Sequence, residues 1–396
     1  MNRIMMSAGV LGAALRINAA GAQPQQPFYY PEPPSGAFRV TKDVPYATAR
    51  GAAAMDIYRP TTPGLAPALI LFTARWASDA RSPREADTRA LGWAKLAAAA
   101  GIVAIIPEVR AEEGTGNATT PTRVANGELS SVVEHLVGHA AEYGIDRDRI
   151  AVMGASGGVW AALPAVQDPR LTAIKAAVMY YGAGKVDAFR LDLPVLFVRA
   201  GLDSRATNAD IDRLIAQALA ENAPVSLLNN NTAHHGFEAR NDDGATRETI
   251  AQTIDFIKHA TAPAFQQTLR DRRLDAVAAA QINAANYAGA AQTYAQLAVL
   301  RPSDRSVRFD YGRTLLADKQ YGPACRELRA LTPISFEAIL PVARSCVLAG
   351  AVDTAMTWLQ GVRKDWMRSE YLKSLTTDSV FAPLWSRPAF QSLFRP

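Results

Sequence analysis

The sequence predicts an α/β protein in which a mostly parallel sheet, flanked by helices, is followed by an all-α region. From residue 68, short apolar runs alternate with longer helical stretches, which is typical of a parallel sheet covered by helices. The strand-like runs stop near residue 265, and a 34-residue period begins at residue 287. Because 49% of the 396 residues are hydrophobic, the chain can bury a large core, which excludes a disordered protein.

Residues 1–22 have the composition of an export signal, and residues 23–36 that of a linker. One positive charge precedes an apolar stretch over residues 5–15, and Ala20-Gly21-Ala22 has the form of a cleavage site. Arg16 is unusual, because signal peptides are rarely charged between these two parts. If the signal functions, the protein is periplasmic or secreted; otherwise it is cytoplasmic. The following segment is rich in Pro and Gln, which predicts an extended linker without regular structure.

Residues 37–262 are expected to form the sheet domain. It begins with a predicted antiparallel hairpin around the turn-forming Arg50-Gly51. Its strands are predicted at residues 39–44, 53–58, 68–72, 102–106, 149–153, 176–180, 195–198 and 224–228, and its clearest helices at residues 85–100, 129–143 and 245–259. A polar stretch at 112–123 predicts a long surface loop, and no Gly-Lys-Ser/Thr follows it to make a phosphate-binding loop.

Ser156 lies in the most informative motif of the chain, a G-x-S-x-G sequence between a predicted strand and a predicted helix. Gly154 and Gly158 leave room for a sharp strand-to-helix turn, which projects the serine over the edge of the sheet. The backbone N–H of Gly157 starts the helix, so it can face a developing oxyanion with the helix dipole behind it. This context predicts a nucleophilic serine.

A serine nucleophile needs a base, and two of the five histidines are well placed for it. His234 and His235 follow the last predicted strand, in a loop that can return over Ser156. Asp203 follows the strand at 195–198, where it can orient an imidazole and stabilise its cationic form. The chain order serine, aspartate, histidine is the one found in hydrolases with this arrangement of strands and helices.

Four phrases make residues 37–260 resemble the α/β-hydrolase superfamily, and within it the serine esterases related to dienelactone hydrolase and feruloyl esterase. They are MDIYRP, GIDRDRIAVMGASGG, the GLD after a late strand, and HHGF. The resemblance implies that Ser156 is the nucleophile, Asp203 the acid and His235, directly before Gly-Phe, the base; His234 is the alternative base. It implies cleavage of a small-molecule carboxylic ester through an acyl-enzyme, without a cofactor or metal.

The chain departs from these esterases after the strand at 68–72. Many of them carry a histidine and glycines there, and one backbone N–H completes the oxyanion hole, whereas this chain reads LFTARWASDA. A backbone donor requires no particular side chain, so the resemblance leaves Arg75, or its neighbour Ala74, as the second donor beside Gly157.

Glu134, His135 and His139 place two imidazoles four residues apart on one predicted helix, a spacing that can hold zinc. The order is not H-E-x-x-H, and no third ligand is evident in the sequence. We therefore interpret them as ordinary helix-surface residues.

Residues 266–396 resemble tetratricopeptide repeats. The pattern Tyr287-x-x-Ala290 recurs 34 residues later at Tyr321, a looser copy begins at Val352, and Gly312 falls at the glycine position of the second copy. The apolar residues Phe381, Leu384, Phe390 and Leu393 predict a terminal cap. The resemblance implies a groove for a peptide or protein partner. The alternative is that the repeats pack against the hydrolase and complete it.

The net charge of +5 resides in the C-terminal region. Residues 1–265 contain 25 basic and 26 acidic residues, whereas residues 266–396 contain 17 and 11. Four of the basic residues cluster around one predicted turn and helix; they are Arg301, Arg305, Arg308 and Arg313. They could attract acidic peptide ends but are more simply a solvated face. Without interleaved aromatic residues they do not predict a nucleic-acid partner.

The sequence has two cysteines and no long apolar run. Cys325 and Cys346 are expected to be buried thiols, although an oxidising compartment would allow them to pair. No apolar run approaches the about 20 residues of a membrane-spanning helix. The sequence thus predicts a serine esterase with a helical-repeat module; the alternatives are a serine peptidase of the same fold and a catalytically silent binding protein.

Overall fold

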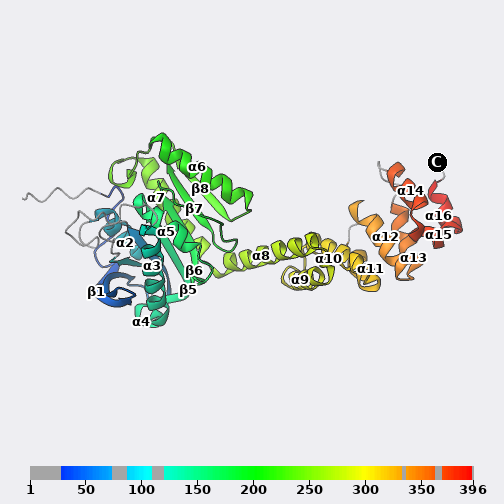
Figure 1. Cartoon of the computed structure of the whole chain (residues 1–396), viewed down its shortest axis with the longest axis horizontal. Coiled ribbons are helices and arrows are strands. Elements are labelled where there is room, and N and C mark those ends of the chain that lie inside the picture. Colours follow the sequence, from blue (N-terminus) through cyan, green and yellow to red (C-terminus); the bar gives the residue numbers. More distant parts are fainter. Residues whose placement is uncertain (1–27, 74–86, 109–119, 332–335, 362–367, 395–396) are drawn as a thin grey trace, which may run out of the picture.

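The computed structural model describes residues 28–73, 87–108, 120–331, 336–361 and 368–394, and within them a sheet domain is followed by a series of helices (Figure 1). The strands are β1 Phe38–Thr48, β2 Gly51–Pro60, β3 Ala66–Thr73, β4 Val103–Pro107, β5 Ile145–Ala155, β6 Ile174–Tyr180, β7 Val195–Ala200 and β8 Val225–Asn230. The helices of the sheet domain are α2 Thr88–Ala99, α3 Thr120–Gly138, α4 Ala140–Tyr143, α5 Gly157–Val166, α6 Arg205–Ala220, the short 3₁₀ helix η1 Phe237–Ala239 and α7 Gly244–Ala260.

The eight strands lie in the order β1-β2-β4-β3-β5-β6-β7-β8. The pairs β1/β2 and β2/β4 are antiparallel, and all neighbours from β4 to β8 are parallel. Each predicted strand overlaps an observed one, so the predicted hairpin and the mostly parallel sheet are confirmed. The chain moves one way along the sheet from β3 to β4 and the other way from β5 onward. The carboxyl ends of β3 and β5 therefore flank the position where ligands bind in such sheets.

The apolar strand runs are buried on both faces of the sheet. Ile70 and Phe72 of β3 face a core that includes side chains of α3, α5 and α6, whereas Leu69 and Leu71 face a second core with α2 and α7. All four are at most 3% exposed. This double burial explains why the strands read as continuous apolar runs rather than as alternating ones.

Two predicted boundaries in the sheet domain are wrong. The helix predicted to begin at residue 129 begins at Thr120, so the last four residues of the loop predicted at 112–123 are helical; residues 112–119 lie outside the described ranges. The helix predicted from residue 85 begins at Thr88, because the Asp87 side chain accepts hydrogen bonds from the N–H groups of Arg89 and Ala90 and caps that end.

The end of the predicted linker packs against the sheet domain. The Phe28 ring meets Trp93 of α2 edge-on, with the ring centroids 5.7 Å apart. The Tyr29 N–H donates to the Glu238 carbonyl oxygen at 2.7 Å, and Glu32 forms an ion pair with Lys95. These contacts hold the last residues of the linker, which form no helix or strand. The predicted signal at residues 1–22 lies outside the described residues and stays a prediction.

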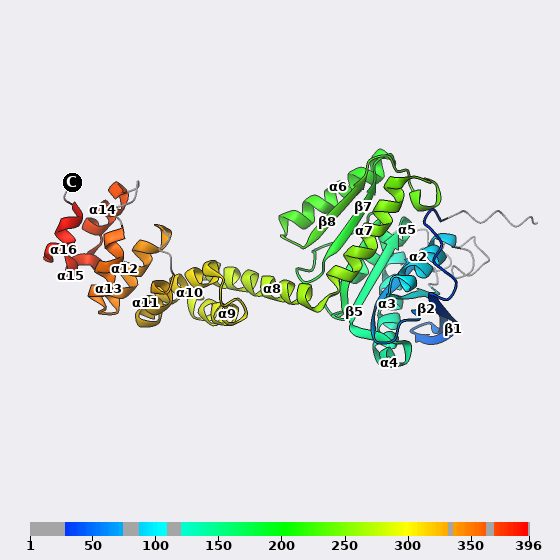
Figure 2. The same ribbon diagram turned by 180° about the vertical axis from the view of Figure 1, so that it is seen from behind.

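The C-terminal region is helical. Its elements are α8 Pro263–Asn283, α9 Tyr287–Leu300, α10 Arg305–Ala317, α11 Tyr321–Arg329, η2 Phe336–Ala338, α12 Ile339–Leu348, α13 Val352–Leu359, α14 Arg368–Thr377, η4 Ser379–Phe381, α15 Ala382–Trp385, α16 Pro388–Gln391 and η5 Ser392–Phe394. The Gln266 side chain joins α8 to the sheet domain by donating to the Lys175 and Ala260 carbonyls. The helices from α9 onward extend away from the sheet (Figures 1 and 2).

The predicted repeats coincide with alternate helices. Tyr287, Tyr321 and Val352 are the first residues of α9, α11 and α13. The alanine three residues later in each copy is fully buried; these are Ala290, Ala324 and Ala355. The four apolar residues of the predicted cap are also buried, at 2% exposure or less. A Cβ on Gly312 would lie 2.4 Å from Leu328 Cγ, so a larger residue there would displace the Leu328 side chain where α10 meets α11.

Cys325 of α11 and Cys346 of α12 form a disulfide, which corrects the expectation of two free thiols. Their Cα atoms are 4.8 Å apart, and both residues are buried as expected. The helices that carry them pack together, which a separation of 21 residues in the sequence does not reveal.

Two arginines of the predicted basic cluster form ion pairs within the protein. Arg301 lies between the carboxylates of three aspartates, which are Asp271, Asp275 and Asp304. Arg308 is 3.3 Å from Glu327, and Arg313 lies over the Phe309 ring. The four arginines therefore do not form a continuous unpaired basic surface.

Candidate active site

Ser156 occupies a strained turn between β5 and α5. Its φ of 53° lies in the left-handed region, which side-chain-bearing residues seldom adopt. Gly182 reveals how tight the turn is, because a Cβ there would lie 2.6 Å from the Ser156 carbonyl oxygen. A Cβ on Gly154 would lie 3.0 Å from the Gly158 carbonyl oxygen. The side chain makes no capping bond to α5 and is available for another partner.

That partner is His235, which also contacts Asp203. Ser156 Oγ lies 2.7 Å from His235 Nε2, and His235 Nδ1 lies 2.7 Å from Asp203 Oδ2. An ionised carboxylate only accepts hydrogen bonds, so Nδ1–H is the donor to Asp203 and Nε2 keeps a lone pair for the serine hydroxyl. The Asp203 side chain is 6% exposed and that of His235 is 37% exposed. The three predicted residues thus form one continuous hydrogen-bonded line.

Asp203 is held by the loop after β7. The Ser204 N–H donates to Asp203 Oδ1 at 2.7 Å, and the Leu202 N–H donates to the Ala233 carbonyl at 2.9 Å. Gly201 permits the close approach of this loop to the loop after β8, because a Cβ on it would lie 2.7 Å from Asn231. This contact brings an aspartate and a histidine 32 residues apart in sequence into hydrogen-bond distance.

The histidine loop rests on a buried polar group. The Tyr181 ring packs against the His235 ring with centroids 4.7 Å apart, and the Tyr181 hydroxyl donates to the Glu238 carboxylate. Tyr181 and Glu238 are both fully buried. Burial raises the pKa of the Glu238 carboxyl, while the Tyr181 hydrogen bond and the charge of Arg89 act in the opposite direction. The adjacent His234 is exposed.

Sequence reasoning missed Tyr181 and Glu238. Tyr181 looks like one more apolar residue at the end of the β6 run, and Glu238 looks like an ordinary polar residue of a loop. An available signal was the position of Tyr181, which follows directly the strand that lies between those carrying Ser156 and Asp203.

The predicted oxyanion donor Gly157 lies at the start of α5. Gly157 is the first residue of α5, so its N–H has no acceptor within the helix and lies beside Ser156 at the positive end of the helix dipole. Arg75 and Ala74, the predicted sources of the second donor, lie outside the described residues.

His135 and His139 engage partners on their own helix and the next one. His135 Nε2 lies 2.9 Å from the Tyr143 hydroxyl, and His139 Nδ1 lies 2.9 Å from the His135 carbonyl oxygen. Across the described ranges, His, Cys, Asp and Glu do not gather in threes as a metal site would need. Within the same ranges, no helix has the length and apolar character needed to span a membrane.

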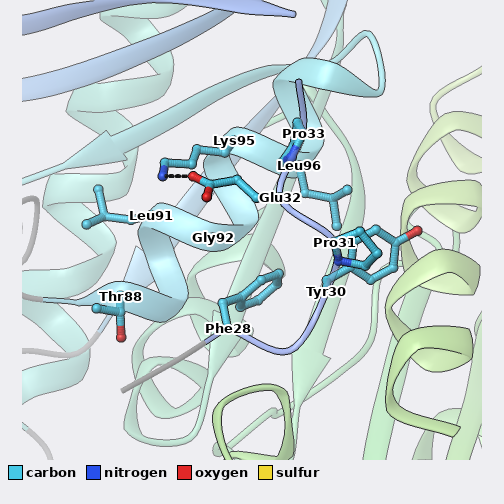
Figure 3. A pocket seen from close by; sticks show the side chains of 10 residues that line it. All are labelled: Phe28, Tyr30, Pro31, Glu32, Pro33, Thr88, Leu91, Gly92, Lys95 and Leu96. Carbon is cyan, nitrogen blue, oxygen red and sulfur yellow. Dashed lines mark hydrogen bonds and ion pairs between the residues drawn. The ribbon is translucent and has the colours of Figure 1, made fainter. Parts of the chain in front are cut away.

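A cavity of about 280 Å³ lies apart from the hydrogen-bonded line, between the N-terminal segment and α2 (Figure 3). Phe28 covers Gly92 at one side, and the Glu32–Lys95 ion pair closes another. None of Ser156, Asp203 and His235 lines it.

The model of the dienelactone hydrolase family matches residues 56–270, just over half of the chain, and this stretch includes Ser156, Asp203 and His235. Among solved structures, the esterase Est22 is 16% identical over 57% of this chain and 82% of its own, with a TM-score of 0.46. A fungal esterase from Rhizomucor miehei is 15% identical over 56% of this chain and 84% of its own, with a TM-score of 0.46. A thermostable esterase from Pseudomonas putida is 12% identical over 57% of this chain and 84% of its own, with a TM-score of 0.47. A search of curated proteins returned no match.

Proposed function

The chain belongs to the dienelactone hydrolase family, and from this premise we propose that it is a serine hydrolase that cleaves carboxylic esters through an acyl-enzyme on Ser156. The observation that carries the proposal is the unbroken line from Asp203 through His235 to Ser156, with both hydrogen-bond distances at 2.7 Å. A serine hydroxyl is a weak nucleophile until a neighbouring base accepts its proton, and this line supplies the base and its orienting carboxylate.

The proposed reaction has two halves. In the first, His235 Nε2 takes the Ser156 proton while Oγ attacks the ester carbonyl carbon, and the Gly157 N–H faces the oxyanion. The C–O bond to the alcohol breaks as the imidazolium returns the proton to the leaving oxygen. In the second half, His235 deprotonates a water that attacks the acyl-enzyme, and Ser156 recovers its proton as the acid departs. Asp203 is nearly buried beside Nδ1, where its charge stabilises the imidazolium.

A fluorophosphonate probe, which reacts covalently with an activated serine, tests this proposal. We expect the wild-type chain to be labelled once and Ser156→Ala not to be labelled. Ser131→Ala is a matched control, because Ser131 is only partly buried on α3 and its hydroxyl donates to the Gly127 carbonyl. Absence of labelling in the wild type, or persistence of labelling in Ser156→Ala, would overturn the proposal. Matched ester and amide substrates then separate an esterase from a peptidase.

We also propose that the helical region is a tetratricopeptide-like module that docks a peptide or protein partner. Two observations support it: the repeated positions begin alternate helices, and the helices from α9 onward extend away from the sheet rather than covering it. Export to the periplasm or beyond the cell is proposed with it, because the Cys325–Cys346 disulfide agrees with an oxidising compartment and with the predicted signal.

A further inference from the structure

Tyr181 lies where the three elements of the proposed triad meet. The Ser156 N–H donates to the carbonyl oxygen of Tyr180 at 3.0 Å, and the Tyr181 N–H donates to the Val198 carbonyl oxygen of β7 at 2.7 Å. The Tyr181 ring then packs against His235 at 4.7 Å between centroids. Tyr180 and Tyr181 therefore contact the Ser156 turn, the strand that leads to Asp203 and the base itself.

Glu238 fixes the far end of the Tyr181 side chain. It belongs to η1, three residues after His235, and its carboxylate accepts a hydrogen bond from the Tyr181 hydroxyl. Its backbone oxygen accepts from the Tyr29 N–H of the N-terminal segment. The hydrogen bond from Tyr181 to Glu238 thus closes a short loop that holds His235 against the tyrosine ring.

The buried pair of Tyr181 and Glu238 lowers the stability of the fold. Glu238 is fully buried, and within the described part of the chain its Oε2 atom has no hydrogen-bond partner. The charge of Arg89 compensates in part, but a buried carboxylate with an unpaired oxygen still lowers the stability of a fold. Tyr181 adds strain, because its φ of 33° lies in the left-handed region. The polar pair therefore has a cost in stability, which argues for a role beyond packing.

We propose that Tyr181 is a positioning residue for His235, and that its hydrogen bond to Glu238 keeps the imidazole aligned between Ser156 and Asp203. The inference rests on the proposed serine hydrolase function. The imidazole must keep one nitrogen on each partner at 2.7 Å, and the Tyr181 ring, with its centroid 4.7 Å from that of the imidazole, restricts how far the imidazole can tilt. Loss of alignment by a fraction of an ångström is enough to slow proton transfer.

The chain offers a matched control one residue away. Tyr180 is also fully buried, and its hydroxyl lies 2.7 Å from Thr253 Oγ1 on α7, outside the histidine loop. We expect Tyr181→Phe to reduce kcat and the rate constant of fluorophosphonate labelling about tenfold with KM unchanged, and Tyr180→Phe to leave all three unchanged. Equal effects of the two variants, or no effect of Tyr181→Phe, would overturn the inference.

Glu238 supplies a rescue arm. Glu238→Gln retains an oxygen that can accept the hydrogen bond from the Tyr181 hydroxyl, so the variant should be labelled at close to the wild-type rate. Glu238→Ala should label as slowly as Tyr181→Phe, and in the double variant Tyr181→Phe/Glu238→Ala the two losses should not add. Additive losses of labelling rate in the double variant would overturn the inference. A Glu238→Gln variant that is labelled as slowly as Glu238→Ala, while retaining the wild-type melting temperature, would also overturn it. An unlabelled wild type overturns the proposed function as well, whereas a labelled wild type with an unaffected Tyr181→Phe overturns only the positioning role.

Discussion

The sheet domain and the helical region bury apolar side chains in different ways. One core of the sheet domain joins Ile70, Val152 and Phe197, which come from three strands far apart in the sequence. The helical region instead has separate clusters, each built mainly from helices that follow one another, such as the one around Tyr294 and Val307. Residues far apart in the sequence therefore come together in the sheet domain, whereas a substitution in the helical region affects mainly the neighbouring helices. The candidate active site needs side chains from distant parts of the sequence, and it lies in the sheet domain.

The largest effect expected in the sheet domain follows from His235→Ala. Without a base, ester turnover should fall by about 10⁴- to 10⁶-fold, with little change in melting temperature because the side chain is partly exposed. His234→Ala, one residue earlier and exposed, should retain wild-type turnover. Steady-state kinetics on an aryl ester decide it, and a reversal of the two results would move the base to His234.

A second prediction concerns the tightness of the serine turn. Gly182→Ala places a Cβ 2.6 Å from the Ser156 carbonyl oxygen, so the turn must shift and kcat should fall about 100-fold. Gly244→Ala is the control, since a Cβ there meets nothing within 4 Å. The assay is kcat with KM measured in parallel. Equal kcat in both variants would mean that the turn tolerates displacement.

The helical region should respond in stability and not in catalysis. Replacing both Cys325 and Cys346 by Ser removes a link across 21 residues, which should lower the free energy of unfolding of this region by about 3 kcal/mol. Calorimetry should detect a shift in one transition, while kcat/KM stays constant. A parallel loss of ester hydrolysis would show that the two regions are coupled.

The buried Glu238 gives the sheet domain a pH dependence of defined sign. Burial raises its pKa above the ordinary value of 4.5, so above pH 4.5 the folded state binds more protons than the unfolded state. Stability therefore falls as pH rises from 4.5 through the folded pKa, by at most about 1.4 kcal/mol per pH unit. Urea unfolding of the wild type and of Glu238→Gln at several pH values measures this dependence. The difference between their free energies of unfolding should become smaller as the pH is lowered toward 4.5. Parallel curves would mean that Glu238 does not titrate in this range.

The smallest effect is expected from truncation. A chain ending at Asn283 keeps α8 with its Gln266 contacts to the sheet domain and loses the helices that extend away from it. Its kcat/KM for a small ester should stay within about twofold of wild type, because none of the removed residues takes part in the hydrogen-bonded line. A large loss would favour the alternative in which the repeats complete the hydrolase.

Local patterns predicted much of this molecule because they depend on neighbours in the sequence. The strands are buried on both faces, so their apolar runs are visible without a structure. The glycines around Ser156 mark the turn, and the alanines of the repeats mark helix crossings. The start of α3 was missed because residues 120–128 are polar and carry no apolar period.

The sequence alone was enough to predict the class of fold and to nominate Ser156, Asp203 and His235 as candidates, since each follows a recognisable strand. The three-dimensional structure was needed to show that these side chains meet at 2.7 Å, that Cys325 reaches Cys346, and that Tyr181 lies between His235 and Glu238. Such contacts depend on how loops from separate strands approach one another. Their spacing in the sequence carries no record of that approach.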